Sequence, residues 1–185
     1  MNPIETPRLL LIPINESIYH EVMKTKTDEE IMHFFGHQSQ ADLDKEKLRF
    51  TGGMTTFNIS YIWFLIHHKA DHKVIGSCSF HKWYTDHNRA EIGYAIYRDE
   101  YKQLGIMSET IREVLIYGFE QMNLHRVEAM IGSGNQASLS LIRNMGFTWE
   151  GLLRDHFLKN GNYEDSNVFS LLKTEFEAHP SFQNR

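Results

Sequence analysis

The sequence predicts an α/β protein built on one mixed sheet, and three observations lead to this fold class. The 185 residues are the length of one domain, and no repeat or linker divides them, so we expect a single domain over residues 1–185. Runs of β-branched and aromatic residues alternate with segments of helical spacing. Glycine and asparagine separate these segments. The expected order is β, α, α, β, β, β, α, β, α, β, β, which gives seven strands.

The first half of the chain predicts a strand, a helical region and a hairpin. Residues 8–12 form a short apolar run between two prolines, which is typical of a strand. Residues 15–52 show helical spacing, so we expect two or three helices there, closed by Gly52 and Gly53. Further strands are expected over residues 61–68, 73–80 and 89–97.

The second half predicts two helices and a long hairpin. Beyond Gly105, apolar residues recur at steps of three and four, which is typical of one buried helix face. Asn135 is a typical helix N-cap, and Gly146 is a typical residue just past a helix end. Asn160-Gly161 is typical of a tight hairpin turn. The remaining strands are expected over residues 125–131, 147–158 and 163–172.

Composition excludes several classes of protein. The net charge of −5 and a pI near 6.1 argue against a general nucleic-acid binder. The lone Cys78 suits a reducing compartment, and no signal peptide or membrane-length apolar run is evident, so we expect a cytoplasmic protein with no membrane partner. His67 and His68 point to opposite faces of a strand and lack spaced partners, so we expect no metal site.

Two strand-to-helix junctions are candidate ligand sites. Gly105 in residues 101–108 precedes a helix N-terminus, whose free N–H groups and dipole favour phosphate. A glycine that only permits a tight turn is the alternative, since no Walker or dinucleotide motif is present. In residues 132–138, the helical spacing aims Ser138 into the protein. Its hydroxyl bonds either a carbonyl of its own helix or a group in a site.

These junctions resemble those of the GCN5-related N-acetyltransferases (GNAT). The resemblance rests on TPRLLLIPI, AEIGYAIYRDEYKQLGIMSETI, GNQASLSLIRNMGF and WEG…NGNYED…SLL, and covers residues 5–173. The chain is most similar to the ribosomal-protein N-terminal (serine/alanine) acetyltransferase branch. The resemblance implies a mostly antiparallel, seven-stranded sheet with helices on both faces. It also implies acetyl-CoA as the acetyl donor, and relatives in this branch often form homodimers.

The resemblance further implies that backbone N–H groups of the glycine loop hold the acetyl-CoA diphosphate. Two positions depart from the family pattern: Lys102 replaces Gln or Arg, and Gln103 replaces a first glycine. The stretch from Gly93 to the loop is one residue longer than usual, so either Ile96 or Tyr97 meets the pantetheine arm. The expected acetyl-CoA-binding residues are Ile96, Tyr97, Lys102, Gln103, Leu104, Gly105, Ile106, Met107, Ser108, Asn135 and Ser138.

Two catalytic residues are expected, Ser138 and Glu91. Ser138 matches a serine that this branch places near the CoA sulfur, whereas Ile142 stands where many members carry a proton-donating tyrosine. Glu91 is the candidate base, because it shares a strand face with Gly93 and Ala95, which leave room for a ligand. A solvated or Arg-paired carboxylate is its alternative. Reserve bases are Asp155 and His156, since Phe157 occupies the position where some relatives place a base.

The implied reaction is direct attack of a neutral amine on the thioester, with the oxyanion bound by an N–H of the strand at residues 92–97. Neutralising an α-amine at pH 7 costs about 1.4 kcal/mol, whereas a lysine-like amine costs about 4.6 kcal/mol. An α-amine therefore needs little help from a base, and the resemblance implies an α-amine acceptor, such as the N-terminus of a ribosomal protein. The alternatives are a small-molecule amine (a polyamine or an antibiotic) and a non-catalytic acyl-CoA-binding module.

An uneven charge distribution bears on the acceptor. Residues 14–50 hold eight acids and five bases, a net of −3, and the family architecture places these helices beside the acceptor cleft. Such a field attracts a cationic amine. The alternative is that these acids are solvated helix faces.

Overall fold

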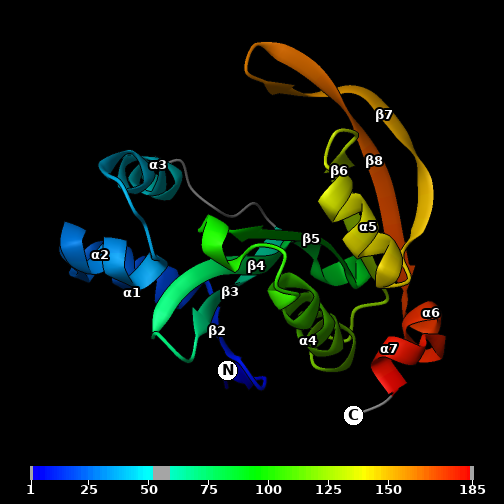
Figure 1. Cartoon of the computed structure of the whole chain (residues 1–185), viewed down its shortest axis with the longest axis horizontal. Helices are drawn as coiled ribbons and strands as arrows, with labels where there is room; N and C mark the ends of the chain where they lie inside the picture. The colour runs from blue at the N-terminus through cyan, green and yellow to red at the C-terminus, as the bar shows by residue number, and fades with distance from the viewer. Residues whose placement is uncertain (1, 52–58, 184–185) are drawn as a thin grey trace.

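The computed structural model describes residues 2–51 and 59–183 and contains one eight-stranded sheet in the order β1-β2-β3-β4-β5-β6-β8-β7 (Figure 1). Neighbouring strands are antiparallel except β5 and β6, which are parallel. The strands are β1 (Ile4–Glu5), β2 (Leu9–Ile14), β3 (Ile59–His68), β4 (Lys73–Tyr84), β5 (Arg89–Ile96), β6 (Arg126–Gly132), β7 (Thr148–Lys159) and β8 (Asn162–Leu172).

The mixed α/β sheet is confirmed, but the prediction of seven strands was wrong by one. The additional strand, β1, is two residues long and pairs with Leu10 and Leu11 of β2. Two residues cannot produce an alternating pattern, so sequence periodicity misses such a strand. The pairing of β2 with β1 ends at Leu11. Beyond Leu11, the outer edge of β2 has no paired strand among the described residues, and Pro13 at this edge has no N–H to donate.

Helices cover both faces of the sheet, as the family resemblance implied. One apolar core lies beneath α4, α5, α6 and α7, and a second lies beneath α1, α2 and α3. Phe64 belongs to the first core and its neighbour Leu65 to the second, because successive strand residues point to opposite faces. The helices are α1 (Glu16–Thr25), α2 (Asp28–Phe35), α3 (Gln40–Thr51), α4 (Ile106–Glu120), α5 (Gln136–Asn144), α6 (Lys173–Ala178) and α7 (Pro180–Gln183).

The predicted boundary residues behave as expected. Asn135 caps α5, and Gly146 lies just past its end with φ +82°. Asn160 and Gly161 both have positive φ and form the two-residue turn between β7 and β8. Gly52 and Gly53, which were expected to close the N-terminal helices, lie outside the described residues.

The feature that creates a site is a split between the parallel strands. β5 pairs with β6 only from Arg89 opposite Arg126 to Glu91 opposite Glu128. Residues 92–96 of β5 therefore diverge from residues 129–132 of β6, and Figure 1 shows β6, β8 and β7 leaving the rest of the sheet as a separate arm. We call the opening between these two stretches the wedge.

Strand alternation decides which backbone groups line the wedge. The Tyr97 N–H donates to the Ile75 carbonyl across β4, at 2.9 Å. In an antiparallel pair, every second residue bonds the partner strand and the others point away from it. The N–H and C=O groups of Ile92, Tyr94 and Ile96 therefore point into the wedge.

Among the helices of residues 2–51 and 59–183, none has the length and apolar character needed to cross a membrane.

Candidate active site

The N-terminus of α4 is an open anion site. Its N-cap is Gly105, at φ +73°, which has no side chain to bond the first-turn N–H groups. Gln103 also adopts a left-handed conformation, with φ +59°. A non-glycine residue pays a steric penalty in this region. Gln103 therefore stands where the family has a glycine, and its backbone still adopts the left-handed conformation that a glycine permits.

Arg8, which precedes β2, holds this loop from outside. Its Nη1 donates to the Leu104 carbonyl at 3.1 Å, and its Nε donates to Glu109 Oε2 at 2.8 Å. A trans peptide directs its C=O and N–H to opposite sides, so fixing the Leu104 carbonyl also fixes the N–H of Gly105. Glu109 lies in the first turn of α4, and its ion pair with Arg8 offsets a negative charge that would disfavour a bound anion.

The remaining expected loop residues surround this N-terminus. Lys102 forms an ion pair with Asp99, and Ile106 is buried in the core. Leu104 is exposed, while Met107 and Ser108 are half-buried. The loop is also anchored by Tyr101, whose hydroxyl donates to Asp71 in the β3–β4 turn.

The N-terminus of α5 lies on the other arm of the wedge. Asn135 Oδ1 accepts a hydrogen bond from the Ser138 N–H, at 3.1 Å, so the amide oxygen serves as a helix cap. Ser138 is half-buried, and Ile142 is fully buried. The expected face of α5 is therefore confirmed, with Ser138 at its margin.

Tyr94 of β5 faces Ser138, a contact that sequence reasoning missed. Its hydroxyl is buried and has no hydrogen-bond partner of normal geometry among the described residues. Burial raises the pKa of the Tyr94 phenol to about 12, and the Ser138 side chain offsets part of that rise. The wedge thus contains a protonated, unsatisfied hydroxyl beside the expected catalytic serine.

Glu91 lies on the face of the sheet opposite Tyr94 and Ser138, where His81 and Lys82 bind its carboxylate. Its Oε1 is 3.1 Å from His81 Nε2, and its Oε2 accepts from Lys82 Nζ at 2.8 Å. Burial tends to raise the pKa of Glu91, but the bonds from His81 and Lys82 outweigh burial and lower it. The carboxylate is neither solvated nor Arg-paired, the two alternatives expected from sequence.

A bulge in β4 brings both partners to Glu91. Successive strand residues normally point to opposite faces, so His81 and Lys82 should diverge. The pairing of β4 with β5 shifts between His81 and Tyr84, and Lys82 has φ +45°. Such a bulge turns the Lys82 side chain back to the face that carries His81.

The space expected beside Gly93 is already filled. A Cβ atom at Gly93 would lie 2.8 Å from His81 Cε1 and 3.2 Å from His81 Nδ1. The glycine is therefore needed by the imidazole ring rather than by a ligand alone. The expectation that Gly93 leaves open room is wrong, because the ring of the opposite strand occupies it.

The reserve bases lie in the β7–β8 hairpin. Asp155 has φ +49° at a register shift, and its N–H donates to Asp165 Oδ1 at 2.8 Å. His156 Nδ1 lies 2.9 Å from Ser166 Oγ. The ring of Phe157 packs against Gly132 at the end of β6.

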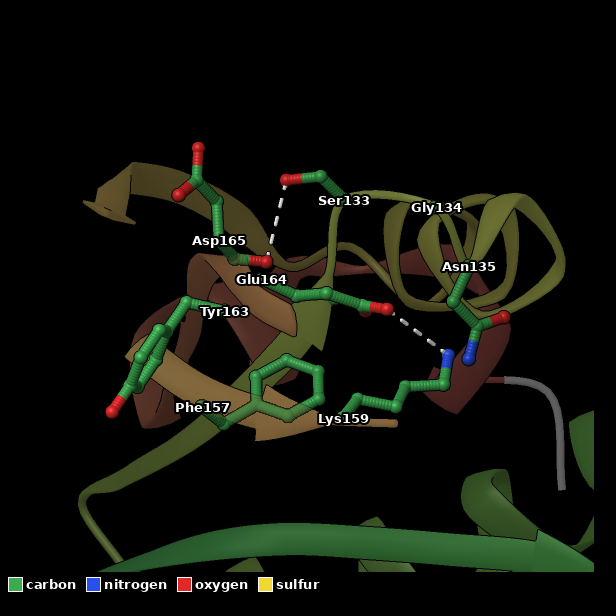
Figure 2. Close-up of a pocket in the computed structure, with 9 residues that line it drawn as sticks. Ser133, Gly134, Asn135, Phe157, Lys159, Tyr163, Glu164 and Asp165 are labelled. Carbon is green, nitrogen blue, oxygen red and sulfur yellow. Dashed lines mark hydrogen bonds and ion pairs between the residues drawn. The ribbon is translucent and has the colours of Figure 1, made fainter. Parts of the chain in front are cut away.

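An open groove of about 690 Å³ extends from the α5 N-terminus along this hairpin. Figure 2 shows Asn135 at one end, with Lys159 and Glu164 reaching toward one another across the groove. Phe157 and Tyr163 contribute aromatic surface. The complete lining is Gly132, Ser133, Gly134, Asn135, Phe157, Lys159, Tyr163, Glu164 and Asp165.

Three of the eight acids of residues 14–50 form ion pairs with other described residues. Glu46 is buried among Tyr19, His37 and Arg49, and Asp28 binds Lys47. Glu30 closes the capping box of α2 and also pairs with Lys26. Each such pair cancels part of the negative field expected at the acceptor cleft.

A family model described as an acetyltransferase (GNAT) domain matches residues 8–148. The chain therefore belongs to the GNAT acetyltransferase family and is an N-acetyltransferase, a class of enzymes that use acetyl-CoA as co-substrate. The family match favours an enzyme over the alternative of a non-catalytic acyl-CoA-binding module.

Three proteins illustrate the relationship. The chain is 31% identical to the uncharacterized N-acetyltransferase YoaA of Bacillus subtilis, over 92% of this chain and 96% of that protein. It is 30% identical to spermidine N(1)-acetyltransferase of Escherichia coli K12, over 50% of this chain and 49% of that protein. The structure of the ribosomal-protein-S5-alanine acetyltransferase from Vibrio fischeri superposes with a TM-score of 0.65 at 20% identity, covering 95% of this chain and 99% of that one.

Proposed function

We propose that this N-acetyltransferase transfers the acetyl group of acetyl-CoA to the α-amine of a protein N-terminus. The observation that carries the proposal is the state of Glu91, whose pKa is lowered by its bonds to His81 and Lys82 against the effect of burial. A carboxylate of lowered pKa is a weak base. An α-amine requires only about 1.4 kcal/mol for neutralisation at pH 7, against about 4.6 kcal/mol for a lysine-like amine, so it suits this site better.

The residues of the wedge fit acetyl-CoA. The uncapped N-terminus of α4 offers the N–H groups of Gly105 through Ser108 to a diphosphate. Because the Tyr97 N–H is taken by Ile75, we assign the pantetheine contact on β5 to the backbone of Ile96. Asn135 uses its oxygen as a helix cap, which leaves its NH₂ group for a pantetheine carbonyl. The acetyl donor supplies a thioester, and the amine nitrogen attacks its carbonyl carbon.

Catalysis is divided between the two faces of the sheet. Glu91 and its partners occupy the face of α1–α3, while Ser138 and Tyr94 occupy the face of α4 and α5. We assign Ser138 to protonate the departing thiolate, with the Tyr94 hydroxyl beside it. The amine is then activated on one face, and the thiol leaves toward the other.

A polyamine acceptor is the second candidate. Glu164 and Asp165 line the open groove together with two aromatic rings, a combination that attracts an extended cation. A spermidine acetyltransferase is among the relatives of the chain. The lysine-like pKa of a polyamine is the argument against it.

The proposal is tested by measuring CoA release with acetyl-CoA and three acceptor classes: peptides with free N-termini, spermidine and an aminoglycoside. We expect the highest kcat/KM with a peptide, and mass spectrometry should place the acetyl group on its N-terminal nitrogen. Turnover with spermidine and not with peptides would replace the proposal by the polyamine function.

A further inference from the structure

Next to the bulge of β4 lies a partly exposed histidine that is bonded to Glu91 through one ring nitrogen. His81 lies directly opposite Glu91 in the β4–β5 ladder, and its Nε2 is 3.1 Å from Glu91 Oε1. Its side chain is 39% exposed, against 11% for Glu91. A ligand can therefore reach the imidazole more easily than the carboxylate behind it.

The bond to Glu91 fixes which nitrogen is available. A carboxylate accepts hydrogen bonds, so Nε2 carries a proton toward Glu91 and Nδ1 is the acceptor of the neutral ring. A Cβ atom at residue 93 would lie 3.2 Å from Nδ1 and cover it. Gly93 has no such atom, so this edge of the ring lies against the glycine, and the 39% exposed fraction of the His81 side chain is what leaves the ring open to a ligand.

This arrangement has the parts of an oriented general base. A neutral imidazole nitrogen is a stronger base than a carboxylate, so it takes a proton from an amine more effectively. The carboxylate fixes the ring and balances the charge that the ring gains. Lys82 binds the second oxygen of Glu91, which keeps that carboxylate ionised.

We propose that His81 is the catalytic base that deprotonates the acceptor amine and that Glu91 is its positioning residue. The inference rests on the proposed acetyl transfer. His81 Nδ1 takes one proton from the ammonium group and passes it to solvent. The amine nitrogen then bonds the acetyl carbon, the carbon–sulfur bond breaks with its electron pair on sulfur, and a second amine proton ends on the thiolate.

The test compares wild type, His81→Ala and His81→Gln with a peptide acceptor at pH 7 and pH 9. The Gln variant retains an N–H group for Glu91 but has no basic nitrogen. At pH 7 we expect kcat/KM to fall by about a hundredfold or more in both variants, with the KM for acetyl-CoA unchanged. At pH 9, above the ordinary α-amine pKa of about 8, the loss should shrink to a few fold, since the free amine is already neutral.

In the described part of the chain, His81 is bonded to the charged group Glu91, and Lys82 bonds the other oxygen of the same carboxylate. His87→Ala, which removes an exposed histidine after β4, is the matched control and should retain full activity. A loss equal at pH 7 and pH 9, or turnover within twofold of wild type at pH 7, would overturn the role of His81. No acetylation of any amine by the wild-type enzyme would instead refute the proposed function.

Discussion

Two buried glutamates of this chain have similar partners but different surroundings. Glu46 on α3 accepts from the Tyr19 hydroxyl at 2.7 Å and from Arg49 at 3.0 Å, and lies 3.4 Å from His37. Burial tends to raise its pKa, but these donors lower it, as His81 and Lys82 do for Glu91. The histidines differ, because His37 is 13% exposed and His81 is 39% exposed beside the wedge.

The comparison shows that a buried carboxylate bonded to a histidine is not by itself a catalytic pair. Glu46 ties three elements together beneath α1–α3, so its role is to stabilise the fold. Glu91 belongs to the strand that opens into the wedge, where its partner can meet a substrate. The following changes test this division of roles.

Glu91→Gln should have the largest effect. The amide cannot balance a charged imidazole, so we expect kcat/KM for a peptide acceptor to fall about a hundredfold at pH 7. The unfolding temperature should change little, because Lys82 is half exposed and regains water. Steady-state kinetics with parallel thermal unfolding measure both. If Glu91→Gln lost as much stability as a Glu46 variant and kept a normal kcat in the folded fraction, Glu91 would have a structural role like that of Glu46.

Glu46→Gln should show the opposite pattern. It leaves Tyr19 and His37 with a neutral partner in a buried site, which we expect to cost about 2 kcal/mol of unfolding free energy. Urea unfolding measures this cost. The kcat of the folded enzyme should equal that of wild type, and a hundredfold lower kcat would place Glu46 in the active site.

Much of this architecture was predictable from local signals. Asn135, Gly146 and Asn160-Gly161 act on backbone conformation within a few residues, and each was placed correctly. The wedge was not visible, because the separation of β5 from β6 depends on pairing between distant segments. The contacts of His81 and Lys82 with Glu91 were not predicted, because a bulge has no periodic signal in the sequence. The burial of Glu46 was not predicted, because the sequence of α3 resembles a solvated, charged helix.

Ser138→Ala tests the other face of the wedge. Removal of the hydroxyl should lower kcat about tenfold, which corresponds to one charge-assisted hydrogen bond, and should leave the affinity for acetyl-CoA nearly unchanged. Calorimetric titration with acetyl-CoA and steady-state kinetics separate the two quantities. Wild-type turnover in this variant would remove Ser138 from the mechanism.

Arg8→Ala tests the support of the phosphate loop. Without the contacts to Leu104 and Glu109, the Gly105 N–H is no longer fixed and the charge of Glu109 is uncompensated. We expect the KM for acetyl-CoA to rise about fivefold with kcat at saturation unchanged. Arg89→Ala, which breaks an ion pair with Glu128 away from the loop, is the control. An equal KM in all three proteins would contradict the role of Arg8.

Substitution of Glu150 should have the smallest effect, which is on the pH dependence of the unfolding temperature. Its bonds from Arg126 and Ser170 lower its pKa from the ordinary 4.5 to about 2. The folded state therefore binds this proton less tightly than the unfolded state, so the stabilisation is present above pH 4.5 and is lost as the pH falls toward 2. Glu150→Gln should show a shallower fall in unfolding temperature over that range. An identical slope in wild type and variant would refute the assignment.

The central claim is that the acceptor is an α-amine, and one competition experiment tests it most directly. Wild-type enzyme receives acetyl-CoA, a peptide with a free N-terminus and an internal lysine, and an equal concentration of spermidine at pH 7. The account predicts that the peptide N-terminal nitrogen is acetylated first. Faster acetylation of the lysine or of spermidine would contradict it.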